Sequence, residues 1–266
     1  MKIFAKSLLA AAAAALSIGA QAAVLIDDFS DPAVGAQVVV DQLFSGVGNG
    51  AGASSSQLGA MIGGARDIYV IEVGGAAPGR FDGGVEGVKA TVSGGVYSFS
   101  TDAGQYGVGI IRWDGPGNTT FNQVAGNSDS TNQTAAIASI MTNGFAAVDL
   151  QASSIGFTIE VLSADAGFPF TLQAYSLGGF SSVTLLSPGG PGFYFIPFAG
   201  FVGTANFGAI TALQAIINFP GAPIVDIDIR VDLASTAVPE PGALALAGLA
   251  LLGAGVARRF TMRAKK

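Results

Sequence analysis

The sequence predicts an all-β fold, an antiparallel two-layer sandwich of jelly-roll-like form. Three observations predict it. Short runs of β-branched and aromatic residues follow one another along the chain, turns rich in glycine, proline and asparagine separate them, and no long stretch has helical periodicity. Apolar residues make up 50% of the 266 residues, so a sizeable core can form although no cysteine is present to make disulfides.

The N-terminus has the three parts of a secretory signal peptide. Lys2 and Lys6 precede an apolar stretch over residues 8–18, and Ala20-Gln21-Ala22 has the small-x-small form of a signal peptidase site. We expect signal peptidase to cleave before Ala23. A buried Ala-rich helix is the alternative interpretation. The prediction divides the chain into a signal peptide (1–22), a β-sandwich domain (23–237) and a C-terminal segment (238–266).

The first half of the domain contains closely spaced strand candidates, at residues 24–29, 36–43, 66–73, 85–92, 96–100 and 106–113. The stretch 66–73 is the clearest, because it is rich in β-branched residues. Residues 46–64 have neither periodicity nor bulk, which predicts an exposed loop. The polar stretch 118–143 is expected to be a long loop with one helical turn.

The second half repeats this pattern, with strands expected at 155–161, 168–175, 181–186, 193–198 and 224–233. In the first of these, residues 155, 157, 159 and 161 are expected on the core face. Pro197 indicates an edge strand or a bulge, because proline cannot donate to a central ladder. Residues 210–219 are ambiguous between helix and strand. The first and last strands are expected to lie side by side.

Charge and composition exclude several classes of function. Seventeen of the 18 acidic residues but only five of the 12 basic residues lie within 23–237, so the domain has a formal charge of about −12. Such a field repels phosphate backbones, and no nucleic-acid partner is expected. The absence of histidine and cysteine excludes Ser-His-Asp and Cys-His catalysis and ordinary zinc sites.

Carboxylates remain as candidate ligands. Asp27 and Asp28 near one end of the domain, and Asp226 and Asp228 near the other, come together if the terminal strands pair, and their oxygens suit calcium. A structural calcium ion is therefore one hypothesis. Ordinary surface charge along a solvated strand is the other.

Catalysis by paired carboxylates is not expected. Glu72, Glu86 and Glu160 are the candidates for glycoside hydrolysis, but their spacing selects no pair, and Glu72 and Glu160 occupy outward positions of alternating strands. The aromatic residues offer faces for stacking on sugars or fill the core, and the sequence leaves both uses open for Tyr97, Tyr106, Trp113 and Tyr175.

The C-terminal segment has three consecutive parts. The motif Val238-Pro239-Glu240-Pro241 breaks regular structure, and the apolar residues 242–257 would form a transmembrane helix of about 24 Å. A basic tail follows. By the positive-inside rule it would hold the C-terminus in the cytoplasm through Arg258, Arg259, Arg263, Lys265 and Lys266.

These three parts, in this order, resemble the PEP-CTERM sorting signal of Gram-negative bacteria. The resemblance implies recognition of Pro239, Glu240 and Pro241 by an exosortase, a membrane cysteine transpeptidase, and temporary anchorage in the inner membrane. It also implies removal of the tail and delivery to the cell surface or extracellular matrix. The body is similar to uncharacterised β-rich domains that precede such signals, through Ile26-Asp27-Asp28-Phe29, Arg66-Asp67-Ile68, Trp113-Asp114-Gly115 and Asp226-Ile227-Asp228.

The expected function is that of a non-enzymatic exported protein with a structural or adhesive role in biofilm or exopolysaccharide, with extracellular polysaccharide as a partner. No cofactor is expected other than the hypothetical calcium. Two alternatives are a carbohydrate-binding module with a jelly-roll fold and a plain single-pass anchored protein that keeps its tail.

Overall fold

A computed structural model describes residues 24–41, 52–75, 87–101, 105–122, 129–164, 168–186, 190–219 and 231–237. The predicted signal peptide and the whole segment 238–266 lie outside these ranges, as do Ala20, Ala22, Ala23, Glu86, Asp226 and Asp228. Within the described ranges, no helix has the length and apolar character needed to cross a membrane.

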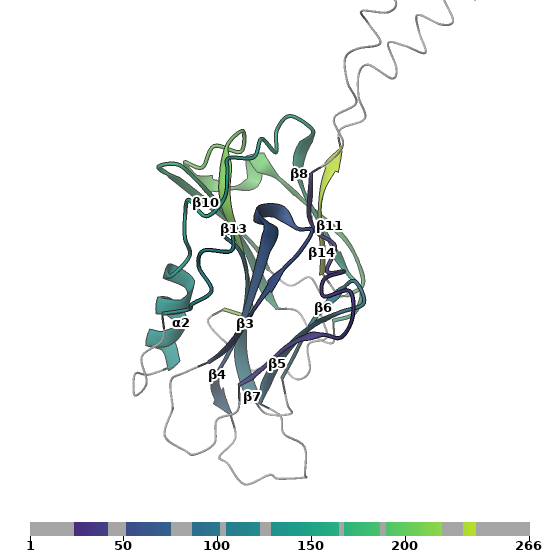
Figure 1. The fold of residues 1–266 in the computed structure, drawn as a ribbon, viewed down its shortest axis with the longest axis vertical. Helices are drawn as coiled ribbons and strands as arrows, with labels where there is room; N and C mark the ends of the chain where they lie inside the picture. Colours follow the sequence, from purple (N-terminus) through teal and green to yellow (C-terminus); the bar gives the residue numbers. More distant parts are fainter. Residues whose placement is uncertain are drawn as a thin grey trace, which may run out of the picture. The chain divides into compact units, whose positions relative to one another are not determined.

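The described strands form antiparallel sheets, of which the largest has seven strands (Figure 1). Its spatial order is β12-β10-β9-β13-β7-β4-β3. The strand bounds, in chain order, are β3 (Ala53–Leu58), β4 (Ala65–Gly75), β7 (Gln105–Trp113), β9 (Pro169–Ser176), β10 (Gly179–Leu186), β12 (Val202–Gly203) and β13 (Ile210–Ile217).

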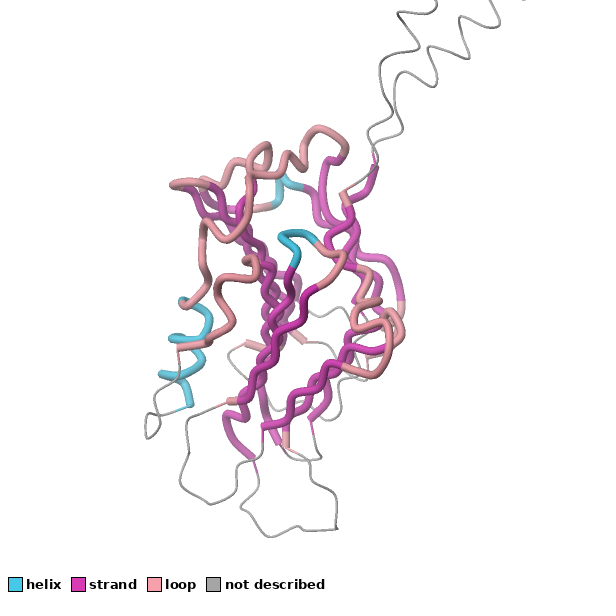
Figure 2. Tube along the Cα trace, in the orientation of Figure 1, coloured by secondary structure: helices cyan, strands magenta, loops and turns pink. Residues whose placement is uncertain are grey.

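Two smaller sheets complete the described part of the fold. One has the order β1-β14-β8-β11, with bounds β1 (Leu25–Asp27), β8 (Ser154–Val161), β11 (Gly192–Pro197) and β14 (Val231–Ala237). The other has the order β2-β5-β6, with bounds β2 (Gln37–Asp41), β5 (Val88–Ser93) and β6 (Val96–Thr101). The helices of the described ranges are α2 (Asp129–Ala138) and the short 3-10 turns η1 (Ile62–Gly64) and η2 (Phe198–Gly200). Figure 2 shows how far strands outweigh helices.

The main core lies between the seven-stranded sheet and the two smaller ones. One cluster of buried side chains draws Ile68 and Leu172 from the large sheet, Phe157 from the four-stranded sheet and Phe99 from the three-stranded sheet. The layers approach so closely that a Cβ on Gly109 would lie 2.8 Å from the Phe99 ring. This arrangement is consistent with the predicted antiparallel sandwich. The jelly-roll topology remains a prediction.

Several sequence predictions are confirmed. The strand predicted at 66–73 is β4, and the stretch near residue 210, which the sequence left ambiguous between helix and strand, is the fully buried strand β13. Pro197 ends β11, which pairs with β8 at the edge of its sheet. The terminal strands pair as expected, since β1 and β14 are antiparallel neighbours with Leu25 opposite Ala234.

Three predictions about local structure are wrong. Residues 53–58 form β3 and not a loop, because their pairing along β4 uses backbone groups and needs no bulky side chains. The predicted helical turn is the ten-residue helix α2, whose Ala136 packs on the outer face of the large sheet. Ile155 is exposed although Phe157, Ile159 and Val161 on the same strand are buried, because it lies next to the beginning of β8.

A buried ion pair joins all three sheets. Arg66 on β4 donates from Nη1 to both carboxylate oxygens of Asp27 on β1, at 2.8 Å each. The same guanidinium donates from Nε to Gln37 Oε1 on β2, at 3.0 Å. Trp113 on β7 donates its indole N–H to Asp27 Oδ2 at 2.8 Å. These side chains are almost completely buried, so each charge depends on the other.

Replacing Asp27 should therefore destabilise the fold strongly. In Asp27→Asn, Arg66 keeps a buried charge without its counter-ion, and we expect a loss of about 3–5 kcal/mol in the free energy of unfolding. The measurement is urea denaturation of the full-length chain in mild detergent. Asp28→Asn is the matched control, because Asp28 is half-exposed and its Oδ1 accepts from the nearby Ser30 N–H, at 2.9 Å. Equal losses in the two variants would contradict the role of the ion pair.

Candidate functional site

Asp27, one of the predicted calcium ligands, forms the buried ion pair with Arg66 instead. Both oxygens of Asp27 accept hydrogen bonds from Arg66, and they also accept from Trp113 and from the Phe29 N–H. Asp28 is half-exposed, and its hydrogen bonds with Ser30 lower the pKa of its carboxyl. In the part of the chain that the structure describes, no three acidic residues are grouped to hold a metal ion. Because Asp226 and Asp228 lie outside that part, the calcium site remains a prediction.

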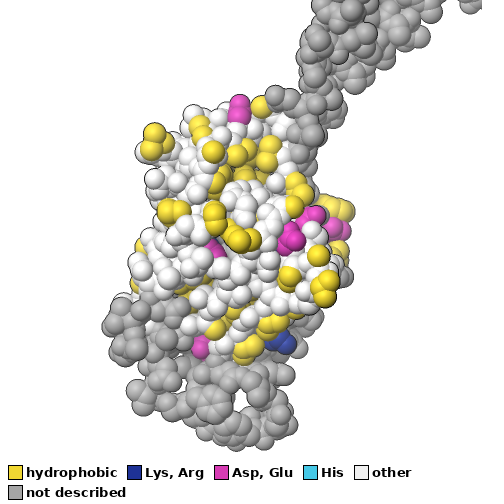
Figure 3. All heavy atoms as spheres, viewed as in Figure 1, with side chains coloured by type: hydrophobic (Ala, Val, Ile, Leu, Met, Phe, Trp, Pro, Cys, Tyr) yellow, Lys and Arg dark blue, Asp and Glu magenta, His cyan; other side chains and the backbone are white. Residues whose placement is uncertain are grey.

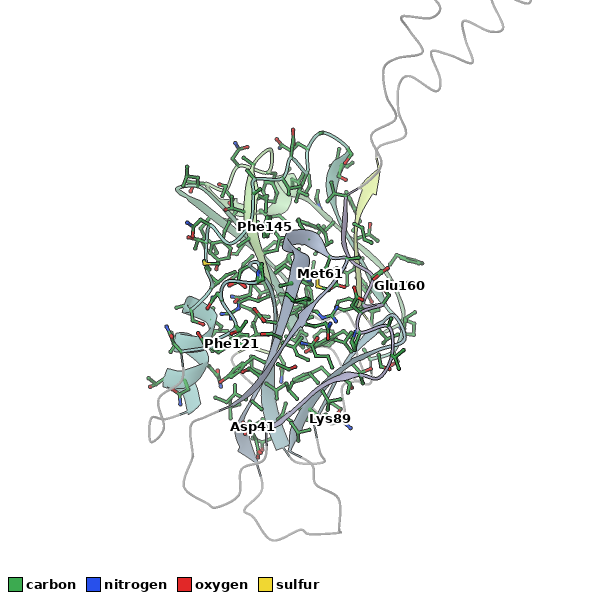
Figure 4. The ribbon with its side chains drawn as sticks, in the orientation of Figure 1. Asp41, Met61, Lys89, Phe121, Phe145 and Glu160 are labelled. Carbon is green, nitrogen blue, oxygen red and sulfur yellow. The ribbon has the colours of Figure 1, made fainter. Side chains whose placement is uncertain are left out.

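The candidate catalytic carboxylates lie on different sheets. Glu72 on β4 is only 4% exposed, so the expectation that it points outward is wrong. The reason is that Glu72 follows Ile68 and Val70 at two-residue spacing, and the side chains of these two residues belong to the main core, so Glu72 lies on the core face of β4. Glu160 is half-exposed on β8 of the four-stranded sheet. Figure 4 shows Glu160 on the opposite side of the view from Phe121, which lies beside α2.

A second buried arginine lies on the outer face of the large sheet. Arg112 on β7 donates to Ser139 Oγ at 2.9 Å and to the Thr120 carbonyl at 3.0 Å. Its guanidinium carbon lies 3.7 Å from the centre of the Phe121 ring. Arg112 thereby holds the segment around α2 against the sheet. The sequence signal for such a residue was an arginine within an apolar strand, next to Ile111 and Trp113.

Two buried carboxylates share Arg112. Its nitrogens lie 3.5 Å from Asp114 Oδ2 and 3.8 Å from Asp67 Oδ2. Asp114 Oδ2 also accepts from Asn118 and from the Met141 N–H, and Asp67 Oδ1 accepts from Ser56 Oγ. Among the described residues, Asp67 Oδ2, Asp114 Oδ1 and Arg112 Nε have no hydrogen-bond partner. Burial, followed by the neighbouring Asp114, raises the pKa of Asp67 to about 6, against the effects of Ser56 and Arg112.

The outer face of the large sheet is covered in one half and open in the other. Helix α2 and Phe121 cover the half built by β4, β7 and β13, where Phe121 stacks on Tyr69 with ring centroids 4.8 Å apart. Strands β9 and β10 lie beyond β13, and their outward side chains are half-buried or exposed. We call this part the open strip. It comprises Pro169, Thr171, Gln173, Tyr175, Phe180, Ser182, Thr184 and Leu186.

The open strip is ordered in cross-strand rows. Tyr175 lies opposite Phe180, Gln173 opposite Ser182, Thr171 opposite Thr184, and Pro169 opposite Leu186. The Tyr175 and Phe180 rings are tilted by 42° with centroids 5.0 Å apart. The two threonine hydroxyls are 2.9 Å apart and hydrogen-bonded. None of these eight side chains is charged.

Hydrogen bonds fix the orientation of the central amide. Gln173 Oε1 accepts from the Tyr175 hydroxyl at 2.9 Å and from Gln214 Nε2 at 2.8 Å. Gln214 Nε2 also donates to the Ile137 carbonyl of α2, at 3.2 Å. Burial raises the pKa of Tyr175 to about 12, so its hydroxyl remains a neutral donor near neutral pH. The described part of the chain offers no partner for Gln173 Nε2 or Ser182 Oγ.

The structure assigns different places to the four predicted aromatic residues. Trp113 and Tyr97 are fully buried and cannot stack on a sugar. Tyr106 is half-buried on β7, and Tyr175 lies in the open strip. Other exposed aromatic residues are on the edge strand β11, where Phe193 is 74% and Phe195 46% exposed. The sequence predicted a strand at residues 193–198, but it did not indicate which face of that strand would be exposed to solvent.

The described surface has almost no positive charge. Arg66 and Arg112 are buried, so Lys89 is the only basic residue of the described ranges whose side chain reaches solvent. Figure 3 shows hydrophobic, uncharged and scattered acidic side chains on one face, with dark blue confined to its lower right, where Figure 4 labels Lys89. An anionic ligand would meet little attraction on this surface.

Comparison with known proteins identifies the C-terminal segment. Residues 237–259 match the PEP-CTERM protein-sorting motif. The chain carries a PEP-CTERM sorting motif. The motif marks an exported protein with a membrane-anchoring C-terminal sorting signal, and it implies processing by an exosortase. The match includes the predicted motif residues Val238, Pro239, Glu240 and Pro241.

The other comparisons say little about the body. No curated protein matches the chain. A similar solved structure is the family 11 carbohydrate-binding module from Clostridium thermocellum in complex with a β-1,3-1,4-mixed-linked tetrasaccharide. The similarity has 12% sequence identity and a TM-score of 0.28, and it covers 76% of this chain and 97% of that one. With these values it carries no inference about a ligand.

The raised pKa of Asp67 predicts a pH-dependent stability. The folded protein binds this proton near pH 6 and an unfolded chain only near pH 4, so stability should fall as the pH rises from about 4 to 6. The shift corresponds to about 3 kcal/mol. Asp67→Asn should remove this component. Urea denaturation from pH 4.5 to 7.5 would therefore show a flatter pH profile for the variant than for the native chain.

The exposed Asp149 provides the control for this experiment. Its Oδ1 accepts from the N–H groups of Gln151 and Ala152, at 2.9 and 3.0 Å. Asp149→Asn makes the same substitution at an exposed site, so it should retain the fall in stability that Asp67 causes between pH 4.5 and 6. If Asp67→Asn retained the native slope between pH 4.5 and 6, the assignment of the titration to Asp67 would be wrong.

Proposed function

We propose that this chain is a non-enzymatic protein that exosortase processing delivers to the cell surface or extracellular matrix, where it has a structural or adhesive role. The observation that carries the proposal is the sorting motif at residues 237–259, which follows an antiparallel β domain. Cleavage by signal peptidase before Ala23 and transient inner-membrane anchorage through residues 242–257 belong to the same proposal.

The described surface supports an adhesive role. Large apolar side chains are exposed on the outer faces of several strands, including Phe193 on β11, Leu58 on β3 and Leu186 on β10. Such side chains favour contact with other surfaces, because each contact removes apolar area from water. Their distribution over several sheets suits a protein with multiple weak contacts in a matrix.

The positions of the carboxylates support a non-enzymatic role. Glycoside hydrolysis needs two carboxyl groups on opposite sides of one bond. Glu72 on β4 is buried, and Glu160 lies on β8, which belongs to another sheet. The buried Asp67 and Asp114 hold Arg112 beneath the segment around α2, where a polymer has no access.

The sorting step predicts a shortened mature protein. Intact-mass analysis of the protein from producing cells should give a C-terminus upstream of Lys266, and cells that lack the exosortase should retain Lys266. Glu240→Ala should also block processing, because the resemblance assigns recognition to Pro239, Glu240 and Pro241. A native protein that still ends at Lys266 in the producing cells would instead identify a plain single-pass anchored protein.

Cells that carry the Glu240→Ala variant also separate delivery from synthesis. We expect the variant to accumulate in the membrane fraction and to fail to restore matrix cohesion in a strain deleted for this gene. Ser235→Ala, a substitution upstream of the motif, serves as the control and should restore cohesion as the native gene does. Full restoration by an unprocessed variant would remove the link between sorting and the proposed role.

A further inference from the structure

We infer that the open strip on β9 and β10 is a binding site for an extended, uncharged polysaccharide chain. This inference rests on the proposed matrix role and adds the ligand class and the residues. It concerns the face that α2 leaves uncovered, with Tyr175 and Phe180 at one end and the hydroxyl and amide groups of Thr171, Gln173, Ser182 and Thr184 beside them.

The chemistry of the strip matches a neutral sugar polymer. Aromatic faces pack against the apolar faces of sugar rings, while hydroxyl and amide groups exchange hydrogen bonds with sugar hydroxyls. Ser182 Oγ and Gln173 Nε2 have no partner among the described residues, and they lie in the same cross-strand row. Their hydrogen-bonding capacity is therefore available to a ligand.

The strip is also organised before any ligand binds. The bonds from Tyr175 and Gln214 fix the Gln173 amide, and Gln214 is itself bonded to α2. Orienting these groups in advance reduces the entropy lost on binding.

Charge decides which polymers suit the strip. Its eight outward side chains are uncharged, and the domain around them has a formal charge of about −12. Anionic polysaccharides would be repelled and would find no cation within the strip, whereas neutral polysaccharides would not be repelled.

The dimensions favour a polymer over a second protein. Pro169 and Tyr175 are six residue steps apart, which corresponds to about 20 Å along a strand, and two strands are about 10 Å wide. The resulting area of about 200 Å² is far below the roughly 800 Å² per partner of a stable protein interface. A narrow strip of this length suits one extended chain.

The test is native affinity electrophoresis of the full-length chain in mild detergent. The gels would contain dextran, mixed-linkage β-glucan, galactomannan or the anionic polymer alginate. We expect retardation by at least one neutral polysaccharide and none by alginate. Phe180→Ala should weaken the retardation about tenfold, whereas Tyr175→Phe, which keeps the ring, should weaken it less. Phe193→Ala on β11 is the matched control and should bind as the native chain does.

A second variant keeps the test decisive if Phe180→Ala does not fold. Ser182→Glu places a carboxylate at the centre of the strip, at a half-exposed position, and should abolish retardation while thermal unfolding stays near that of the native chain. Three results would overturn the inference: no retardation by any neutral polysaccharide, equal losses in Phe180→Ala and Phe193→Ala, or a dimer in sedimentation that Phe180→Ala dissociates. Because the assay uses purified protein, failure here would leave the proposed sorting untouched, and failure of sorting would leave this result untouched.

Discussion

The buried ion pair between Asp27 and Arg66 is the interaction on which the arrangement of the sheets depends. Strand β1 is only three residues long, too short for its own ladder to hold it firmly in place. Arg66 attaches it to the large sheet, and the contact with Gln37 on β2 brings the three-stranded sheet to the same point. Water is excluded from the pair, so neither charge can leave its partner without a large desolvation cost.

The two buried arginines have the same role on opposite faces of the β4–β7 pair. Arg66 connects the core face to the smaller sheets, and Arg112 connects the outer face to the segment around α2. Burying both arginines also changes the charge of the surface. With both arginines inside, the described exterior is left with Lys89 and an excess of carboxylates, so the same interactions that assemble the fold also remove cationic sites from its surface.

Sequence patterns predicted most of the strands, because alternation and turn residues are local signals. The pairing of β1 with β14 was expected from the fold class and not from any local signal. Sequence patterns did not predict β3, whose serine-rich strand depends on β4 for its hydrogen bonds. They also did not predict that Asp27, Arg66 and Trp113, each in a short motif noted from the sequence, would meet. Asp27 is 39 residues from Arg66 and 86 from Trp113, and one sequence gives residue types but not such pairings.

The open strip could not be predicted from the sequence, and the reason is again a contact between distant parts of the chain. The outward residues Gln173 on β9 and Gln214 on β13 lie opposite one another, yet Gln214 is buried and Gln173 is not. The difference comes from α2 and the chain after it, which cover β13 and stop short of β9. A site on this sheet is therefore defined by the extent of a helix 35 residues or more away in sequence from Gln173. The position at which that cover ends determines which outward residues can meet a ligand.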